Sequence, residues 1–135
     1  MSLDPAALPA AVVAFARERH LATLTTLRPD GTPHVVPVGF TWDPDTRIVR
    51  IITFAPSRKV RNLRAATAAG GMPRAVVCQV DGGRWLTFEG PATVTDDPAR
   101  VAEAVRRYAE RYRQPGARVD RVAVEIAVDH VLGRA

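Results

Sequence analysis

The sequence predicts a mainly β fold, a small antiparallel β-barrel with peripheral helices. Six segments rich in β-branched residues are separated by short turns, while one helical segment is inserted among them and another precedes the last strand. The 135 residues are one domain's worth of chain, which buries about two thirds of its unfolded surface. We therefore expect a single domain over residues 1–135.

The first half of the chain is expected to be a helix followed by a three-stranded meander. Residues 1–19 have no basic segment ahead of their apolar part, which favours an amphipathic helix over a secretory signal and predicts a cytoplasmic location. Strands are predicted at 20–27, 34–42 and 47–54, joined by the turns RPDGTP and DPDT.

The second half is expected to hold a hairpin, a helix and a last strand. AVVCQV (75–80) and RWLTFEGPATV (84–94) flank the turn DGG. Alternating apolar positions across 121–132 predict one closing strand.

The helix between the hairpin and the last strand has clear sequence signals. Asp97 is predicted to cap it, with Pro98 in its first turn. Its Arg and Glu residues are expected to face water. Its expected apolar face consists of Val101, Val105, Tyr108 and Tyr112.

Composition excludes several classes of protein. The net charge of +5 suggests nucleic-acid binding, but Arg is scattered among Asp and Glu without an aromatic stacking series, so no nucleic-acid partner is expected. No apolar run reaches the roughly 18 residues of a membrane helix. Cys78 is the single cysteine and lies in an apolar run, which predicts a buried, unreactive thiol.

Residues for direct catalysis are not evident. His20, His34 and His130 lack metal-ligand spacing, and the sequence contains no nucleophile elbow or carboxylate pair. We predict no metal site and assign no catalytic residue. Each histidine is interpreted as structural, with His34 the least secure because it opens an unusual strand. An enzyme of this kind would depend on a bound cofactor.

The segment APSRKVRNL (55–63) places cations where a helix should begin. Each cation there costs about 0.3–1 kcal/mol unless an anion lies among them. Ser57 is expected to cap the helix and, with free backbone N–H groups and the charges of Arg58 and Lys59, to hold a phosphate. Lys59 is the only lysine among 19 basic residues, which favours a site for a compact point charge, although chance retention is the alternative.

Other irregular positions fit a ligand site and a subunit interface. Pro37 removes a ladder donor in mid-strand and Gly39 removes a side chain, which leaves room for a flat ligand or marks a bulge at a barrel corner. Trp85 is either interface packing or a wall of a ligand pocket. Because HVVPV and RIIT are apolar on both faces, we expect a homodimer.

Nearly the whole chain resembles a known family, the flavin and deazaflavin oxidoreductases with the pyridoxamine 5'-phosphate oxidase-like split barrel. HLATLTTLRPDGTPHVVPVGFTWDPDT resembles the family's first two strands, SRKVRNL its phosphate segment, and CQVDGGRWLTFEGPATV its fourth and fifth strands. RYAERYRQP followed by RVAVEIAVDHVLG is most similar to the small actinobacterial branch that uses coenzyme F420. The resemblance implies a six-stranded antiparallel split β-barrel of the FMN-binding type.

The resemblance also implies a cofactor site. The coenzyme phosphate would be held at the SRK segment, the ring would lie along the second strand, and two further candidates would come from either subunit. The implied cofactor-binding residues are Val36, Pro37, Val38, Thr53, Ser57, Arg58, Lys59 and Asn62, with Gln79 and Trp85 as the further candidates.

The implied activity is hydride transfer from reduced coenzyme F420 to a conjugated organic acceptor, with biliverdin as the first candidate. Two alternatives stay open from the residues: an FMN-binding oxidoreductase of the same fold, and a non-catalytic flavin- or haem-type ligand-binding protein.

Overall fold

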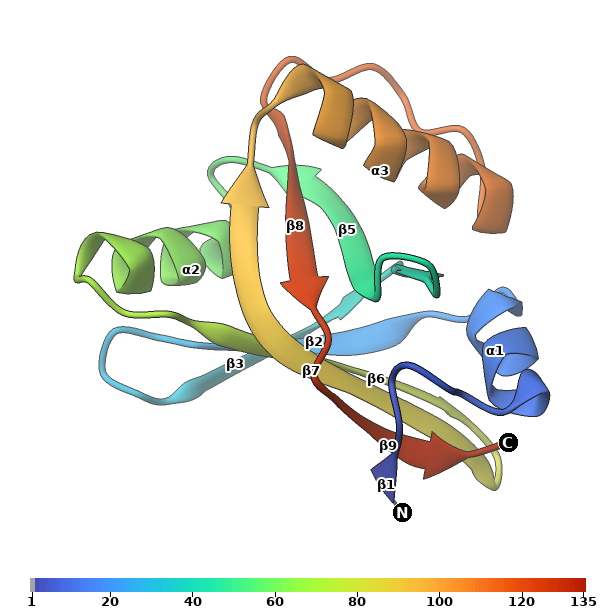
Figure 1. The fold of residues 1–135 in the computed structure, drawn as a ribbon. Helices are drawn as coiled ribbons and strands as arrows, with labels where there is room; N and C mark the ends of the chain where they lie inside the picture. The colour runs from blue at the N-terminus through green and yellow to red at the C-terminus, as the bar shows by residue number, and fades with distance from the viewer. Residues whose placement is uncertain (1) are drawn as a thin grey trace.

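The computed structural model describes residues 2–135, in which an antiparallel sheet curls around a hydrophobic core and helices lie at its margins (Figure 1). The helices are α1 (Ala10–Arg17), α2 (Arg58–Ala68) and α3 (Pro98–Arg111). The strands are β1 (Ser2–Leu3), β2 (Ala22–Leu27), β3 (Pro33–Val38), β4 (Thr41–Asp43), β5 (Ile48–Phe54), β6 (Arg74–Asp81), β7 (Arg84–Thr95), β8 (Arg121–Ala127) and β9 (His130–Arg134).

Two parts of the sheet share the long strand β7. Its first half pairs with β6 and β9, and its second half pairs with β8, so that the strand bends through both parts (Figure 1). The sheet order is β3-β2-β6-β7-β8-β5-β4. Because β3 and β4 follow each other in the chain but lie at opposite ends of this order, their connection closes a split barrel. The predicted antiparallel barrel with peripheral helices is confirmed. The predicted number of six strands is wrong, because the described residues form a nine-stranded sheet: two predicted strands each divide, and the short β1 is added.

The prediction of one continuous strand over 34–42 is wrong. β3 pairs with β2, whereas β4 pairs with β5, and the chain changes partner between them at Gly39 and Phe40. At this bend the backbone N–H of Phe40 donates to the Tyr112 hydroxyl at 3.2 Å instead of to a neighbouring strand. At this corner the Tyr112 hydroxyl therefore takes the place of the backbone acceptor that a neighbouring strand would provide.

The prediction of one strand over 121–132 is also wrong. β8 ends at Ala127, after which the N–H groups of Val128 and Asp129 each donate at 3.0 Å to carbonyls outside β8 and β9. The chain crosses against β7 at Gly90, where a Cβ atom would lie 1.9 Å from the Ala127 carbonyl oxygen. Continuous apolar alternation does not reveal this change of sheet.

The helix α3 begins as predicted, but its polar residues do not all face water. The Asp97 carboxylate accepts from the backbone N–H of Arg100 at 3.1 Å, which confirms the cap. Arg107 instead reaches the buried Asp43 at 3.0 Å, and Arg111 donates to the Glu18 carbonyl at 2.7 Å. Acceptors at the barrel end draw these two arginines inward.

The core is aromatic at its centre. The Trp42 and Phe88 rings stack with centroids 4.6 Å apart, and Phe40 meets Phe88 edge to face at 5.9 Å. Phe15 of α1 is fully buried at one end. The predicted N-terminal helix is thus present and packs its apolar face against the barrel.

Cys78 is not buried as predicted. It lies on the outward face of β6, opposite Thr23 and Thr87, and is half-exposed, whereas Val77 and Gln79 on either side point into the core. No helix within residues 2–135 is both long and apolar enough to cross a membrane.

Asp43 gives the fold a testable dependence on pH. Burial alone would raise the pKa of this carboxyl, but hydrogen bonds from Thr46, Arg50 and the backbone lower it from 3.8 to about 2. A carboxyl whose pKa is depressed by folding contributes stability above its unfolded pKa and loses it as pH falls through its folded pKa, here between about pH 4 and pH 2. We predict that Asp43→Asn removes about 2 kcal/mol of stability at pH 7 and that the loss shrinks toward pH 2.

Chemical denaturation of the two proteins from pH 2 to pH 7 measures this effect, with the exposed Asp45→Asn as control. Equal stability of Asp43→Asn and the parent at pH 7 would contradict the assigned role.

Candidate functional site

A cleft of about 290 Å3 opens where the bend after β3 meets the end of β5 and the start of α2. Its remaining wall comes from α3 and the loop that follows. Four of the residues with an implied cofactor role line it, namely Pro37, Val38, Thr53 and Lys59. Its other lining residues are Gly39, Ile52, Phe54, Tyr108, Pro115, Arg118 and Arg121.

The basic helix begins where the sequence predicts, but its cap differs. Ser57 occupies the N-cap position with extended backbone, and its side chain makes no capping hydrogen bond. The Ser57 hydroxyl instead accepts a hydrogen bond of 3.3 Å from the Thr53 hydroxyl at the end of β5. The first-turn N–H groups of α2 lack intrahelical acceptors, so this helix end favours an anion.

Two cations pack against the ring of Phe54 in the cleft. The Lys59 ammonium lies 5.8 Å from the ring centroid, and the Arg118 guanidinium lies 4.1 Å from it. Burial lowers the pKa of Lys59, because a desolvated ammonium is less stable than a hydrated one. A half-buried cation of this kind gains from a bound anion.

The cleft has no carboxylate among its lining residues. Arg118 donates to the nearby Asp120 at 2.5 Å, and Arg121 donates to the Gly116 carbonyl at 2.8 Å. Asp120 also acts on Arg121 through its charge, but neither interaction neutralises Lys59. The local charge is therefore positive, which suits an anionic ligand.

The bend at Gly39 brings α3 against the cleft. A Cβ atom at Gly39 would lie 3.0 Å from the rings of both Tyr108 and Tyr112. Gly39 therefore lets the end of α3 approach closely, and Tyr108 becomes part of the wall. Gly39 thus lies at a barrel corner and Pro37 lines the cleft, while the flat ligand expected there stays a prediction.

His34 lies near this positive region. Burial, together with Arg28, Lys59 and Arg58, lowers the pKa of its imidazole, so the neutral form is favoured. Its buried Nδ1 has no hydrogen-bond partner among residues 2–135. The structure thus sets His34 apart from the other two histidines, both of which contact carboxylates.

The other residues with an implied cofactor role lie around the cleft or away from it. Arg58 is exposed at the start of α2. Val36 packs against the core. Gln79 is fully buried and donates to the Phe15 carbonyl at 2.9 Å. Trp85 lies on β7 opposite Val80, on the outward face of the sheet. Their roles stay predictions.

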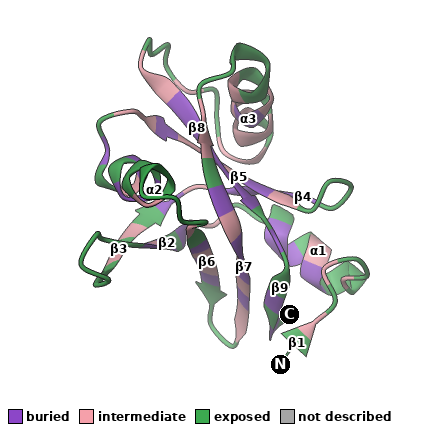
Figure 2. Ribbon diagram, turned by 60° about the vertical axis from the view of Figure 1, so that its left-hand side comes forward, coloured by how far each residue is buried: buried purple, intermediate pink, exposed green. Residues whose placement is uncertain are grey.

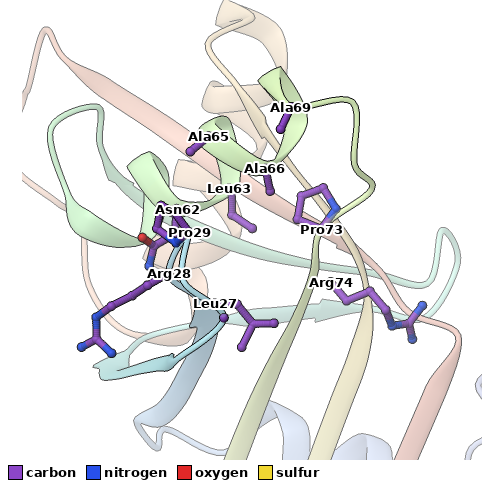
Figure 3. A pocket seen from close by; sticks show the side chains of 11 residues that line it. Leu27, Arg28, Pro29, Asn62, Leu63, Ala65, Ala66, Ala69, Pro73 and Arg74 are labelled. Carbon is purple, nitrogen blue, oxygen red and sulfur yellow. The ribbon is translucent and has the colours of Figure 1, made fainter.

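Asn62 lies against a different cavity. It lines a pocket of about 320 Å3 between α2 and the loop that joins β2 to β3, together with Leu27 and Leu63 (Figure 3). Its amide nitrogen donates to the Thr26 hydroxyl at 3.1 Å, and its buried Oδ1 has no hydrogen-bond partner in the part of the chain that the structure describes. The structure therefore does not bring Asn62 and Lys59 to the same cleft.

Sequence reasoning missed Tyr108, Pro115, Arg118 and Arg121 as cleft residues. Tyr108 was assigned to an apolar helix face, and the two arginines lie in a chain where Arg occurs in every segment. No local signal separates these arginines from solvated ones. Only the fold places the loop after α3 beside β5.

A group of possible metal ligands lies elsewhere. Ligand atoms of Glu18, His20 and Asp81 lie within 4.8 Å of one another. Arg84 contacts both carboxylates, with its guanidinium 2.6 Å from Glu18. These ion pairs compete with a cation for the same oxygens.

Comparison with known proteins identifies the family of this chain. It matches the pyridoxamine 5'-phosphate oxidase family over residues 8–135. The chain belongs to this family. One similar protein is the F420H(2)-dependent biliverdin reductase of Mycobacterium tuberculosis (strain CDC 1551 / Oshkosh). It is 51% identical over 123 residues, and the alignment covers 91% of this chain and 85% of that protein.

Solved structures share the fold of this family member. A conserved hypothetical protein from Mycobacterium tuberculosis matches with a TM-score of 0.76 at 24% identity, covering 94% of this chain and 84% of that one. An F420 reductase matches with a TM-score of 0.72 at 24% identity, covering 93% of this chain and 98% of that one. The family and the split-barrel fold inferred from sequence are confirmed.

Lys59 should be unfavourable for the stability of the ligand-free protein. Folding lowers its pKa through burial, so its charged form costs free energy below the folded-state pKa, and its position near the start of α2 adds an unfavourable dipole contact. We predict that Lys59→Ala leaves stability unchanged or raises it by about 0.3–1 kcal/mol.

Thermal and urea unfolding without ligand measure this effect. Arg61→Ala is the matched control, because Arg61 is an exposed cation on the same helix. A clear loss of stability in Lys59→Ala, absent from Arg61→Ala, would show that Lys59 serves the fold instead.

Proposed function

We propose that this protein is an oxidoreductase that transfers a hydride from reduced coenzyme F420 to biliverdin. The observation that carries the proposal is the 51% identity, over 91% of the chain, to a protein named for that reaction. The positive cleft supports it independently, because the coenzyme carries a phosphate. Absence of turnover with this pair of substrates would refute the proposal.

The cleft and the adjoining start of α2 suit such a coenzyme. Lys59 supplies a desolvated positive charge beside the first turn of α2, and Ser57 lies buried at that helix start. Pro37 has no N–H group to satisfy, so a flat ring can lie against this part of β3 without leaving a donor unpaired. Lys59, Arg58 and Ser57 would hold the phosphate, and Pro37, Val38 and Thr53 would border the ring.

The coenzyme, when bound, supplies the hydride, and the chain supplies position and electrostatics. The rigid ends of β3 and β5 would fix the ring, because both strands are paired to neighbours next to the cleft. Tyr108 and Pro115 would exclude water from one side. The positive charge of the cleft would stabilise negative charge that develops on the acceptor as the hydride arrives.

We also propose that the protein acts as a homodimer through the outward face of β3, β2, β6 and β7. Apolar side chains stand exposed on this face, and Figure 2 shows exposed stretches along β3 and β6. Val35 and Leu27 are each 55% exposed, and Val80 is 62% exposed. Large exposed apolar side chains on one sheet face favour an interface with a partner.

The dimer face adjoins the cleft. Pro37 belongs to both, since it is exposed on the outward side of β3 and lines the cleft. A partner that covers this face would bring its own residues, with Trp85 as the implied candidate, beside the coenzyme. We also propose that residues 1–135 form one domain and that the protein acts in the cytoplasm.

Direct assays test the reaction. Purified protein is titrated with coenzyme F420, FMN and biliverdin, and oxidation of reduced F420 is followed by absorbance with and without biliverdin. Turnover that requires both F420 and biliverdin is expected. Tight FMN binding with no F420 binding would favour the FMN-dependent alternative, and binding without turnover would favour a ligand-binding protein.

Lys59 should control coenzyme affinity. Loss of a hydrogen bond to a charged group predicts that Lys59→Ala weakens F420 binding by about 1.5–3 kcal/mol. Binding by the parent should also weaken as salt increases, through screening. Fluorescence titration measures both effects, and Arg61→Ala should bind as the parent does. Parental affinity in Lys59→Ala at low salt would remove Lys59 from the site.

A charge on the outward face should disrupt the dimer. We predict that the parent sediments at about twice 14.6 kDa at micromolar concentration and that Val80→Asp shifts the protein toward the monomer. Val119→Asp is the control, because Val119 is fully exposed in the loop after α3. A parent protein that is monomeric yet fully active would contradict the shared site.

A further inference from the structure

We propose that Arg118 and Arg121 form a carboxylate-binding subsite in the wall of the cleft. This subsite would hold a propionate of the biliverdin acceptor. This inference rests on the proposed function. It adds a second anion-binding element from the loop after α3 and the start of β8.

Both arginines are held in place by the fold. Arg121 is the first residue of β8 and pairs with Phe54 across the sheet, next to the cleft. Arg118 packs its guanidinium over the Phe54 ring at 4.1 Å. The ring of Phe54 thus supports one cation from the loop, and the strand that carries Phe54 aligns the other.

Each guanidinium keeps donors free. Asp120 accepts from Nε of Arg118 at 2.5 Å and from one terminal nitrogen at 3.4 Å, while no hydrogen bond occupies the other terminal nitrogen among the described residues. Arg121 uses one terminal nitrogen for the Gly116 carbonyl. A planar guanidinium offers five N–H donors, so an incoming carboxylate still finds partners on both side chains.

The charge count favours two anionic groups in this cleft. Lys59, Arg118 and Arg121 line it, and Asp120 is the one carboxylate that interacts with the two arginines, bonding Arg118 and acting more weakly on Arg121. Three cations against one carboxylate leave two positive charges, of which one lies beside the helix start and the other is shared by the two arginines. With a phosphate bound at Lys59, the guanidinium groups of Arg118 and Arg121 remain available to a second anion. A carboxylate suits them, because its two oxygens match the paired N–H donors of a planar guanidinium.

Biliverdin carries two propionates, whereas coenzyme F420 carries carboxylates on its glutamate tail, so the source must be tested. The parent, Arg118→Gln, Arg121→Gln and Arg118→Lys are assayed with biliverdin and with its dimethyl ester. Arg113→Gln is the matched control, since Arg113 is exposed in the same loop and does not line the cleft.

We expect each Gln variant to raise KM for biliverdin about tenfold, the factor for one charge-assisted hydrogen bond, and to leave KM for the dimethyl ester unchanged. Arg118→Lys should recover part of the effect, because it keeps the charge and loses the fork. Dissociation constants for F420 with its tail and for the form without glutamates should stay at parental values.

Other outcomes overturn the inference in distinguishable ways. A loss of affinity confined to tailed F420 would assign the carboxylate to the coenzyme and refute the acceptor assignment. Equal KM values in the parent and both Gln variants would refute the subsite. If the parent shows no turnover, the proposed function fails, and absorbance titration of biliverdin and its ester still tests the subsite by binding alone.

Discussion

The hydrogen-bonded junction at the end of α3 is the interaction on which the rest of the structure depends. Arg111 donates to the carbonyls of Glu18 and Phe40 and to the Gln79 side chain. Tyr112 donates to the His20 carbonyl at 2.6 Å and accepts from the Phe40 N–H. This junction ties the end of α1, the bend between β3 and β4, and β6 to one helix end.

The cleft exists because of this junction. Without partners from α3, the polar backbone groups of Phe40 would be left unpaired where the chain changes sheet, at a cost of about 1–3 kcal/mol each. The same contacts place Tyr108 over Gly39 and lead the following loop past the end of β5. The same contacts therefore close the barrel and form one wall of the cleft.

The distribution of partners separates structural arginines from those of the cleft. Arg50 and Arg107 share the buried Asp43, and Arg74 binds Glu89 and Asp129. Exposed pairs of the latter kind contribute little stability individually but neutralise charge locally. In contrast, no carboxylate lines the cleft around Lys59 and Arg121, so the positive charge of these side chains is only partly balanced there.

The sequence by itself determined the antiparallel class, the hairpins, the start of α2 and the cap at Asp97, because these depend on alternation, turn residues and short-range hydrogen bonds. Irregularities in the sequence also indicated Pro37 and Lys59, and the family resemblance indicated Thr53; the fold brings these three residues to one cleft. Only the tertiary structure decided that 34–42 and 121–132 each divide between two parts of the sheet, since a strand that changes partner keeps its apolar alternation. The same holds for Arg118 and Arg121, which the pairing of β5 with β8 brings to the cleft across about half the chain. It also holds for Asn62, which the orientation of α2 turns toward another pocket. Such contacts join residues far apart in sequence, and no local pattern encodes the distance between them.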